Sequence, residues 1–348
     1  MTVASQLPKH VADMIFTAFS AEFATLSKAG APINTPALVF PREDWSTIDM
    51  STGLAYPAKA ERLRRNPKAG LWIDGVLPGE PTISIAGMGA TKDADIQANA
   101  LRYIAEVGGY GPGPMTDWDL EHRAVWYWSR VFMTVAPTEI LWWDSGEDLD
   151  KQPHRWEVTA DTIWPTSDPA PAGRPSEAPQ WPQPHWTELM AVALERPSGG
   201  HLTLVDANGF PRPAKARNIE QTPDGFIMDL PRCAPGDRNG PASLSFMGFE
   251  NFIGRASEDA GRLRLTVERA LPLLPFVTDP QEQWTPKPAT REAMMGRLTA
   301  ELERRGQPLP VIPSAKPAPT RGGQLRAERF ARVMAQAGLF PDWGGGAG

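Results

Sequence analysis

The fold of this chain is decided by residues 51–73, which read STGLAYPAKAERLRRNPKAGLWI. The middle of the stretch predicts a short helix over residues 58–65. This helix ends at Asn66, because the proline that follows disfavours the α conformation of the residue before it. The apolar run at residues 69–73 predicts a buried strand, so the stretch reads as a turn, a short helix and a strand.

The start of this unit is rich in hydrogen-bond donors. Ser51 and Thr52 precede the turn, and Lys59 falls in the first turn of the predicted helix. The helix also carries Arg62, Arg64 and Arg65. Free N–H groups at a helix start, together with hydroxyls and a cation, favour the binding of a phosphate. The alternative is a basic helix that faces solvent.

Four patterns follow one another along the first half of the chain. They are an A-T-L-x-x-x-G-x-P run from Ala24 to Pro32, the Ser51-Thr52 pair, a K-x-x-x-L-x-x-N-P run from Lys59 to Pro67, and an I-x-G-x-G-A-T-x-D run from Ile85 to Asp93. In this order they resemble the FMN-binding split β-barrel family, which includes pyridoxamine 5′-phosphate oxidase and related flavin reductases. The resemblance covers residues 16–144.

This resemblance implies both a fold and a cofactor site. The fold would be a six-stranded Greek-key barrel that pairs with a second barrel, with FMN at the junction between them. The family's phosphate-binding positions correspond here to Ser51, Thr52 and Lys59. Arg64, on the same predicted helix, is a further candidate for cofactor binding.

Three other residues are candidates for contact with the flavin. Asn34 and Thr35 lie where members of the family place polar groups that face it, although a polar pair at a strand edge is the alternative. Gly87 belongs to a Gly-Met-Gly sequence that follows an alternating strand predicted over residues 82–86. These glycines either let the backbone approach a ring closely or mark a β-bulge.

Residues 124–135 predict an unusual strand, in which Trp126, Trp128 and Arg130 alternate onto one face. An arginine among aromatic rings can stack on a ring and still bind an anion. We therefore expect Trp126 and Trp128 to contact the substrate and Arg130 to be catalytic. A barrel strand whose arginine reaches the rim is the alternative. His122 is a candidate general acid or base, or else a surface histidine.

The second half of the chain repeats the first in a degenerate form. The sequence HLTLVDANGFPRP at residues 201–213 corresponds to the run that begins at Ala24, which predicts a second barrel and an internal pseudo-dimer. Where the first copy has its lysine helix, the second has RCAPGDRNGP at residues 232–241. We therefore expect one phosphate site, and one flavin, per chain.

The whole chain is predicted to be mainly β with flanking helices, an α+β arrangement. The expected divisions are a flavin-binding barrel at residues 1–150, a proline-rich linker at 151–184, a degenerate barrel at 185–280 and a helical extension at 281–348. Within this extension, the apolar spacing predicts helices over residues 291–305 and 325–337.

Composition excludes several classes of function. The net charge of −6 argues against non-specific binding to nucleic acid, which needs a basic surface. No apolar run is long enough to span a membrane, and the first residues lack the core of a signal peptide. A single cysteine fits a reducing cytoplasm. The five histidines lack the close spacing of metal ligands, so no metal site is expected.

The function expected from these patterns is that of an FMN-dependent oxidoreductase acting on a small aromatic or conjugated molecule. The flavin would carry out the redox chemistry, so no catalytic nucleophile is needed. Deazaflavin F420 and haem are alternative cofactors, and a non-catalytic flavin-binding module is an alternative function. A homodimer is a further possibility beside the internal pseudo-dimer.

Overall fold

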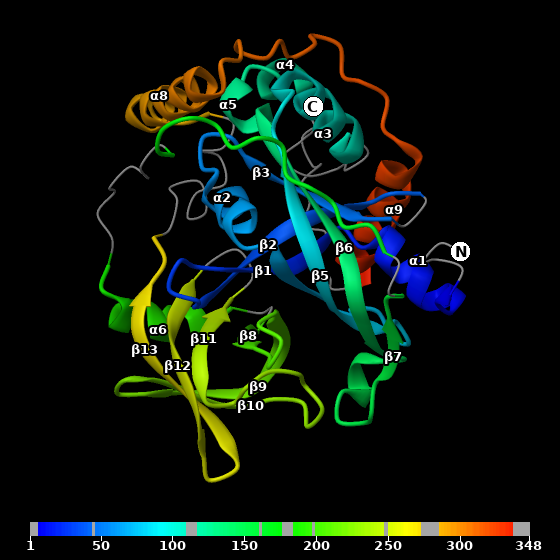
Figure 1. Ribbon diagram of the computed structural model, residues 1–348, viewed down its shortest axis with the longest axis vertical. Coiled ribbons are helices and arrows are strands. Elements are labelled where there is room, and N and C mark those ends of the chain that lie inside the picture. Colours follow the sequence, from blue (N-terminus) through cyan, green and yellow to red (C-terminus); the bar gives the residue numbers. More distant parts are fainter. Residues whose placement is uncertain are drawn as a thin grey trace, which may run out of the picture.

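The structure is a computed structural model that describes residues 6–43, 46–108, 117–159, 162–175, 184–196, 199–246, 250–272 and 285–336. It contains two antiparallel β-barrels that pack against each other, the first above the second in Figure 1. Helices cover the first barrel on the side away from the second. The predicted pair of tandem barrels, mainly β with flanking helices, is therefore confirmed.

The first barrel is built from six strands. They are β1 (Ser20–Leu26), β2 (Pro32–Pro41), β3 (Ile48–Gly53), β4 (Lys68–Ile73), β5 (Thr82–Lys92) and β6 (Arg130–Trp143). Their order is β3-β2-β1-β4-β5-β6, and the pairing of β3 with β6 closes the barrel. A short strand, β7 (His154–Glu157), pairs with β6 and lies within the stretch predicted as a linker.

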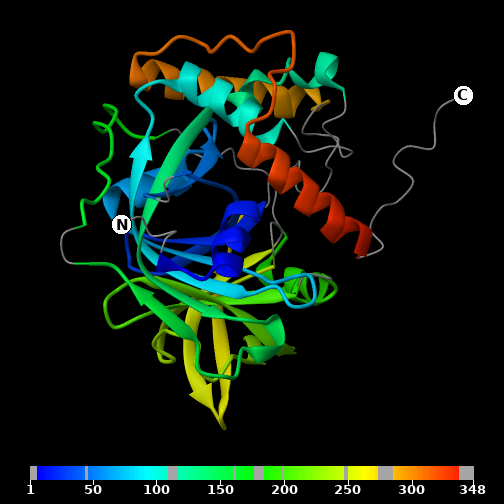
Figure 2. The same cartoon turned by 90° about the vertical axis from the view of Figure 1, so that its right-hand side faces the viewer.

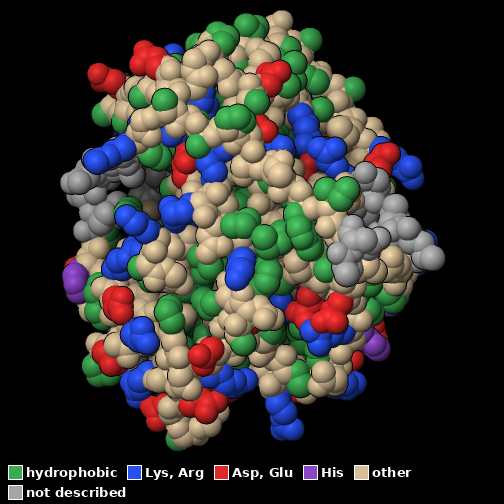
Figure 3. Space-filling view, viewed as in Figure 1, with side chains coloured by type: hydrophobic (Ala, Val, Ile, Leu, Met, Phe, Trp, Pro, Cys, Tyr) green, Lys and Arg blue, Asp and Glu red, His purple; other side chains and the backbone are tan. Residues whose placement is uncertain are grey.

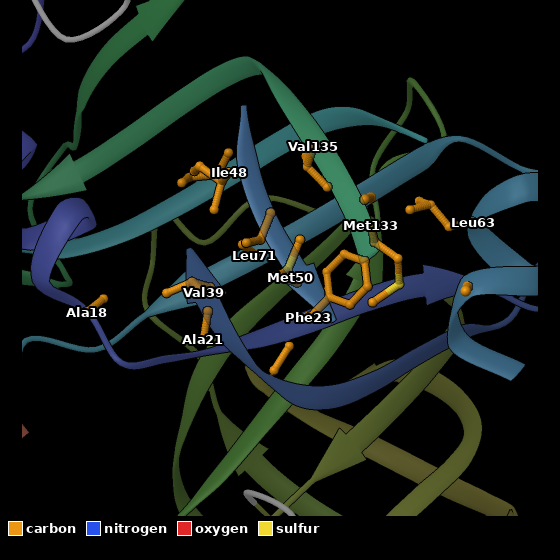
Figure 4. Packing of buried hydrophobic residues seen from close by; sticks show 14 of the residues in the cluster. Ala18, Ala21, Phe23, Val39, Ile48, Met50, Leu63, Leu71, Met133 and Val135 are labelled. Carbon is orange, nitrogen blue, oxygen red and sulfur yellow. The ribbon is translucent and has the colours of Figure 1, made fainter. Parts of the chain in front are cut away.

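Apolar side chains fill the interior of this barrel because alternate residues of each strand point inward. Phe23, Val39 and Met50 from three neighbouring strands meet there (Figure 4). The helix α2 (Ala58–Arg65) packs on the barrel through the buried Leu63. Gly89 of β5 allows this contact, because a Cβ at that position would lie 2.6 Å from Leu63 Cδ1.

The second barrel repeats this plan. Its strands are β8 (Gly200–Val205), β9 (Pro211–Thr222), β10 (Gly225–Asp229), β11 (Gly240–Ser245), β12 (Asn251–Asp259) and β13 (Arg262–Ala270). They close in the order β10-β13-β12-β11-β8-β9, with β9 paired to β10. The loop between β10 and β11 replaces the α2 helix of the first barrel.

The two barrels pair in a pseudo-symmetric way. The strand β9 of the second barrel lies against β1, β4 and β5, while β2 of the first lies against β8, β11 and β12. The contact of β4 with β9 brings backbones together, since a Cβ on Gly70 would lie 1.8 Å from the carbonyl oxygen of Pro211. Only glycine permits such an approach.

Helices flank the barrels. They are α1 (Lys9–Thr17), α3 (Ile96–Val107), α4 (Trp118–Glu121), α5 (Val125–Trp128), a 3-10 turn at Gly146–Asp148, α6 (Trp186–Leu194), α8 (Pro288–Arg305) and α9 (Arg321–Gln336). Figure 2 shows α8 crossing above the first barrel and α9 descending beside it. No helix in the described part of the chain is long and apolar enough to span a membrane.

The strand predicted over residues 124–135 is wrong in its first part. Residues Val125–Trp128 form the helical turn α5, and β6 begins only at Arg130. The reason is that β3 ends at Gly53, which pairs with Arg130, so the residues before Arg130 have no partner in β3. Before that point the chain turns back on itself, and Trp128 Nε1 donates to the carbonyl oxygen of Glu121 at 2.7 Å.

Candidate functional site

The side of the barrel junction next to α2 is built around Lys59. Its amino group donates to the carbonyl oxygen of Pro36 on β2 at 2.9 Å, so the side chain lies back along the barrel. Burial is the main cause that lowers the pKa of Lys59 to about 7, and the nearby charges of Arg62 and Arg130 add to it, against the opposing effect of Glu22. An anion bound nearby would therefore stabilise the protonated form of Lys59 and raise its pKa.

Three arginines, Arg62, Arg65 and Arg269, lie on the same α2 side of the junction as Lys59. Arg62 donates from Nε to the Thr25 hydroxyl at 2.8 Å, and burial, together with the charges of Arg65 and Arg269, lowers its pKa to about 10. Arg269 comes from β13, so both barrels contribute. In the described part of the chain, none of the four cations forms an ion pair with a carboxylate. Lys and Arg side chains gather near the left edge of Figure 3, close to where the barrels meet in Figure 1.

Arg130 adds a fifth positive charge, held in a cage of tyrosines. Its Cζ lies 4.1 Å from the ring centroids of both Tyr103 and Tyr127. Burial alone would lower the pKa of Arg130, but Tyr103, Tyr56 and Tyr127 outweigh it and raise the pKa. Arg130 is thus a buried, permanently charged group whose guanidinium stacks on tyrosines, whereas the sequence suggested tryptophans.

Polar side chains at the same junction lack partners. The side-chain atoms of the buried Asn34 have no partner at hydrogen-bond geometry among the described residues, although Asn34 lies close enough to Glu22 to lower the pKa of that carboxyl. The hydroxyl of Thr35, on the opposite face of β2, also has no partner there. Asn251 of β12 donates to the Asn34 carbonyl oxygen, which places the second barrel directly against this strand. Buried polar groups normally have partners, so these atoms are suited to contact a polar ligand.

The centre of the junction is a buried cluster of three titratable side chains, His201, Asp74 and Glu22. His201 of β8 is fully buried, and its Nε2 lies 2.8 Å from Asp74 Oδ2 and its Nδ1 3.8 Å from Glu22 Oε1. Burial acts to lower the pKa of His201, but Asp74 and Glu22 outweigh it and raise the pKa. The same histidine holds the pKa of Asp74 well below its usual range, while burial raises that of Glu22.

Ser51, Thr52 and Arg64, also predicted to bind the cofactor, make other contacts in the structure. Ser51 and Thr52 belong to β3 and not to the start of α2, so the expected hydroxyls at the helix start are absent, and Pro57 precedes that helix. The Thr52 hydroxyl donates to the Tyr56 carbonyl oxygen at 3.4 Å. Arg64 points away into an ion pair with Asp93 at 2.7 Å. Their binding of a cofactor stays a prediction.

Gly87 marks a bulge, which was one of the two interpretations of the Gly-Met-Gly sequence. The register between β5 and β6 shifts between Ala86 and Gly87. A Cβ on Gly87 would lie 2.5 Å from Val135 Cγ1 and 2.7 Å from the Ala136 carbonyl oxygen. The packing of β6 therefore accounts for this glycine, and its contact with a flavin stays a prediction.

The residues expected around the substrate are buried in packing contacts. Trp126 belongs to the core of the first barrel, and the fully buried Trp128 packs against Tyr103 and Trp118. His122 ends α4, where its Nδ1 lies 2.6 Å from the Trp118 carbonyl oxygen. These positions account for the three side chains without a substrate, and their functional roles stay predictions.

The opposite side of the junction contains a cleft of about 430 Å³ between β5, β6 and β7 of the first barrel and the β8–β9 turn of the second. Cys233, from the loop that replaces α2, also lines it. Here the cations are paired, since the buried Arg212 lies 2.6 Å from Glu139 and 3.8 Å from Asp206. This cleft lacks the excess of positive charge found next to α2.

Among the comparisons with known proteins, only the search of solved structures found proteins similar to this chain. No protein-family model matches the chain, and no curated protein matches it. A pyridoxamine 5′-phosphate oxidase-related, FMN binding protein from Nostoc punctiforme is 14% identical with a TM-score of 0.32, and the match covers 45% of this chain and 91% of that one. A conserved hypothetical protein from Mycobacterium tuberculosis is 22% identical with a TM-score of 0.33, covering 45% and 94%. General stress protein 26 from Bacillus anthracis is 14% identical with a TM-score of 0.30, covering 43% and 97%.

Sequence reasoning missed the contributions of the second barrel to the site. Arg269 and Asn251 lie more than 180 residues beyond Lys59, and neither belongs to a local motif. The internal repeat was the available signal, because a pseudo-dimer packs strands of one barrel, here β8, β11 and β12, against β2 of the other. The tyrosine cage gave no such signal, because Tyr56, Tyr103 and Tyr127 come from three separate segments.

Proposed function

We propose that the chain binds a phosphorylated flavin or deazaflavin at the α2 side of the barrel junction and acts as an oxidoreductase on a small molecule. The observation that carries this proposal is the group of cations without carboxylate partners, formed by Lys59, Arg62, Arg65 and Arg269. Crowded positive charges destabilise one another, and a bound dianion relieves that repulsion.

The residues of the junction divide the tasks of binding. Lys59 and Arg62 would hold the phosphate, with Arg65 and Arg269 adding positive potential from the two barrels. The unpartnered amide of Asn34 and hydroxyl of Thr35 would bond polar atoms of the cofactor. Arg130, held between Tyr103 and Tyr127, adds a fixed positive charge that would stabilise negative charge on the reduced flavin ring.

When bound, the flavin supplies the transfer of electrons, and the protein supplies binding, orientation and electrostatics. Trp126 and Trp128 are buried in packing contacts, so an aromatic or conjugated substrate stays a prediction and the proposal names only a small molecule. The absorbance spectrum of the purified protein distinguishes flavin, deazaflavin and haem. Turnover with a reduced cofactor then separates an enzyme from a carrier.

Replacing Lys59 with alanine tests the position of the site. Loss of one charge-assisted contact to phosphate costs about 1.5–3 kcal/mol, which corresponds to a roughly ten- to hundredfold weaker affinity for FMN. Lys68→Ala is the matched control, because Lys68 also lies at the junction but donates to the carbonyl oxygen of Asn208 in the second barrel. Fluorescence titration of FMN into each variant measures the difference. Equal affinities in the two variants would show that the site is misplaced.

A further inference from the structure

A second cavity, of about 570 Å³, lies apart from the barrel junction. It opens to solvent and is lined by α1, α3, the chain that follows β2 and the start of α9. Four arginines line it, Arg42, Arg102, Arg321 and Arg326, together with two carboxylates, Glu43 and Glu106, so the arginines are in excess. None of the residues that line it belongs to the candidate site at the junction, so its chemistry requires a separate explanation.

Two of the arginines share one carboxylate. Arg102 Nη2 lies 2.8 Å from Asp49 Oδ2, and Arg42 Nε lies 3.3 Å from the same oxygen. Asp49 is fully buried behind the cavity wall, so its negative charge interacts with Arg42 and Arg102 and not with a ligand in the cavity. Arg102 is also held in place by Phe132, whose ring centroid lies 4.4 Å from its Cζ. The guanidinium of Arg102 is therefore fixed before any ligand binds.

Arg326 is fixed at the beginning of its own helix. It is 1% exposed, it forms an ion pair with Glu106, and its Nε has no hydrogen-bond partner among the described residues. A Cβ on Gly322 would lie 2.8 Å from Arg326 Nη1, so the absence of a side chain there makes room for the guanidinium. The side chain thus reaches back to the first turn of α9, as long side chains in helices do.

Arg321 and Arg326 place positive charge at the N-terminus of α9, which already carries the positive end of the helix dipole. At this helix start the Gly323 N–H already donates to the Thr320 hydroxyl, and the two arginines add two full charges beside the partial charge of the helix. Glu106 offsets part of this charge, but it also accepts a hydrogen bond from the Thr320 hydroxyl at 3.0 Å. A helix start surrounded by cations is stabilised by an anion.

We propose that this cavity binds the phosphate group of a small metabolite. Guanidinium groups present paired N–H donors that match phosphate oxygens, and the start of α9 adds backbone donors. The volume falls within the range of about 300–1,000 Å³ for ligand pockets, so it accommodates more than the phosphate alone. Phe16 of α1 supplies an apolar wall for the remainder of the ligand.

The test uses the full chain with inorganic phosphate and pyrophosphate as probes, measured by calorimetry at constant ionic strength. The Lys59→Ala background weakens competing binding at the barrel junction, and the further arginine variants then report on the cavity itself. In this background we expect pyrophosphate to bind, and the further changes Arg42→Ala and Arg321→Ala to weaken it by at least about tenfold. Both arginines are solvent-accessible, so these variants are expected to fold, and their melting temperatures check this.

The exposed Arg291 on α8 provides the matched control, and Arg291→Ala should bind pyrophosphate as tightly as its parent. Two results would overturn the proposal. One is that the Lys59→Ala protein binds neither probe. The other is that removing Arg42 and Arg321 leaves the affinity unchanged while the fold is intact.

Discussion

The two sides of the barrel junction occupy equivalent places in the fold but have opposite chemistry. On one side, β2 meets β11 and β12 beneath the helix α2, and on the other, β9 meets β4 and β5 beneath a loop. The first side gathers Lys59, Arg62 and Arg269 without carboxylate partners, whereas the second neutralises Arg212 with Glu139. Duplication of a barrel thus provided two equivalent sides of the junction, and only the α2 side carries cations without carboxylate partners.

The same divergence occurs at the centre of the junction. The hairpins β1–β2 and β8–β9 can be aligned at the pair next to each turn, Leu26 with Pro32 in the first barrel. Four residues before Leu26 on β1 is Glu22, which pairs with Pro36. In the second barrel His201 stands in that register position, opposite Lys215. Two identical barrels would bring two glutamates or two histidines together here. The chain brings a histidine to a glutamate, which favours pairing between its own two halves.

The largest effect is expected where the backbones of the barrels touch. Gly70→Ala would place a methyl group 1.8 Å from the Pro211 carbonyl oxygen, which the strands can relieve only by moving apart. We expect a loss of about 3 kcal/mol in the free energy of unfolding, measured by urea denaturation. Gly240→Ala on β11, where no atom lies within 4 Å, is the control. Equal stability of the two variants would contradict the described junction.

The next effect concerns the affinity for FMN as pH rises. Free Lys59 loses its proton above a pKa of about 7, whereas a bound phosphate, a dianion above about pH 6, raises that pKa. The affinity should therefore fall between pH 7 and 9, by no more than the Lys59→Ala substitution removes. Titrations across this range test the expectation. A profile that is equally steep in Lys59→Ala would assign the pH dependence to another group.

A smaller effect is expected from the buried histidine. Because Asp74 and Glu22 raise the pKa of His201, its contribution to stability is fully present below pH 6.5, its ordinary pKa, and is lost as pH rises through the folded pKa. Glu22, whose pKa is also raised, acts in the same direction at lower pH, while Lys215 opposes protonation of His201. His201→Gln should lose on the order of 1 kcal/mol at pH 6.

The difference between wild type and His201→Gln should shrink as pH increases above 6.5, as followed by urea denaturation at several pH values. His154→Gln is the control, because His154 is an exposed residue at the edge of the first barrel. A constant difference across pH would show that His201 contributes only through packing.

Local patterns in the sequence were sufficient to predict the barrels and the unit at their junction. The helix over residues 58–65 was predicted at its observed bounds, because Asn66-Pro67 ends it without help from the rest of the fold. Failures came where distant contacts decide the conformation. The aromatic run before Arg130 reads as a strand, but it lies beyond the end of β3 and so lacks a partner.

The candidate site was predictable only in the part that one barrel supplies. Lys59, Asn34 and Thr35 could be found from their order in the chain, and the structure brings their strand and helix together at the junction. Arg269 comes from the second barrel, and its positive charge helps to lower the pKa of Arg62. No local pattern predicts such a pairing, since it depends on how the two barrels dock.

The most direct measurement of the central claim is the number of flavins bound per chain. Protein saturated with FMN is separated from free cofactor and denatured, and the released flavin is counted against the protein concentration. The account predicts one flavin per chain, and a strongly reduced amount in Lys59→Ala under the same conditions. Two flavins per chain, or one that persists undiminished in Lys59→Ala, would contradict the assignment of cofactor binding to the α2 side of the junction.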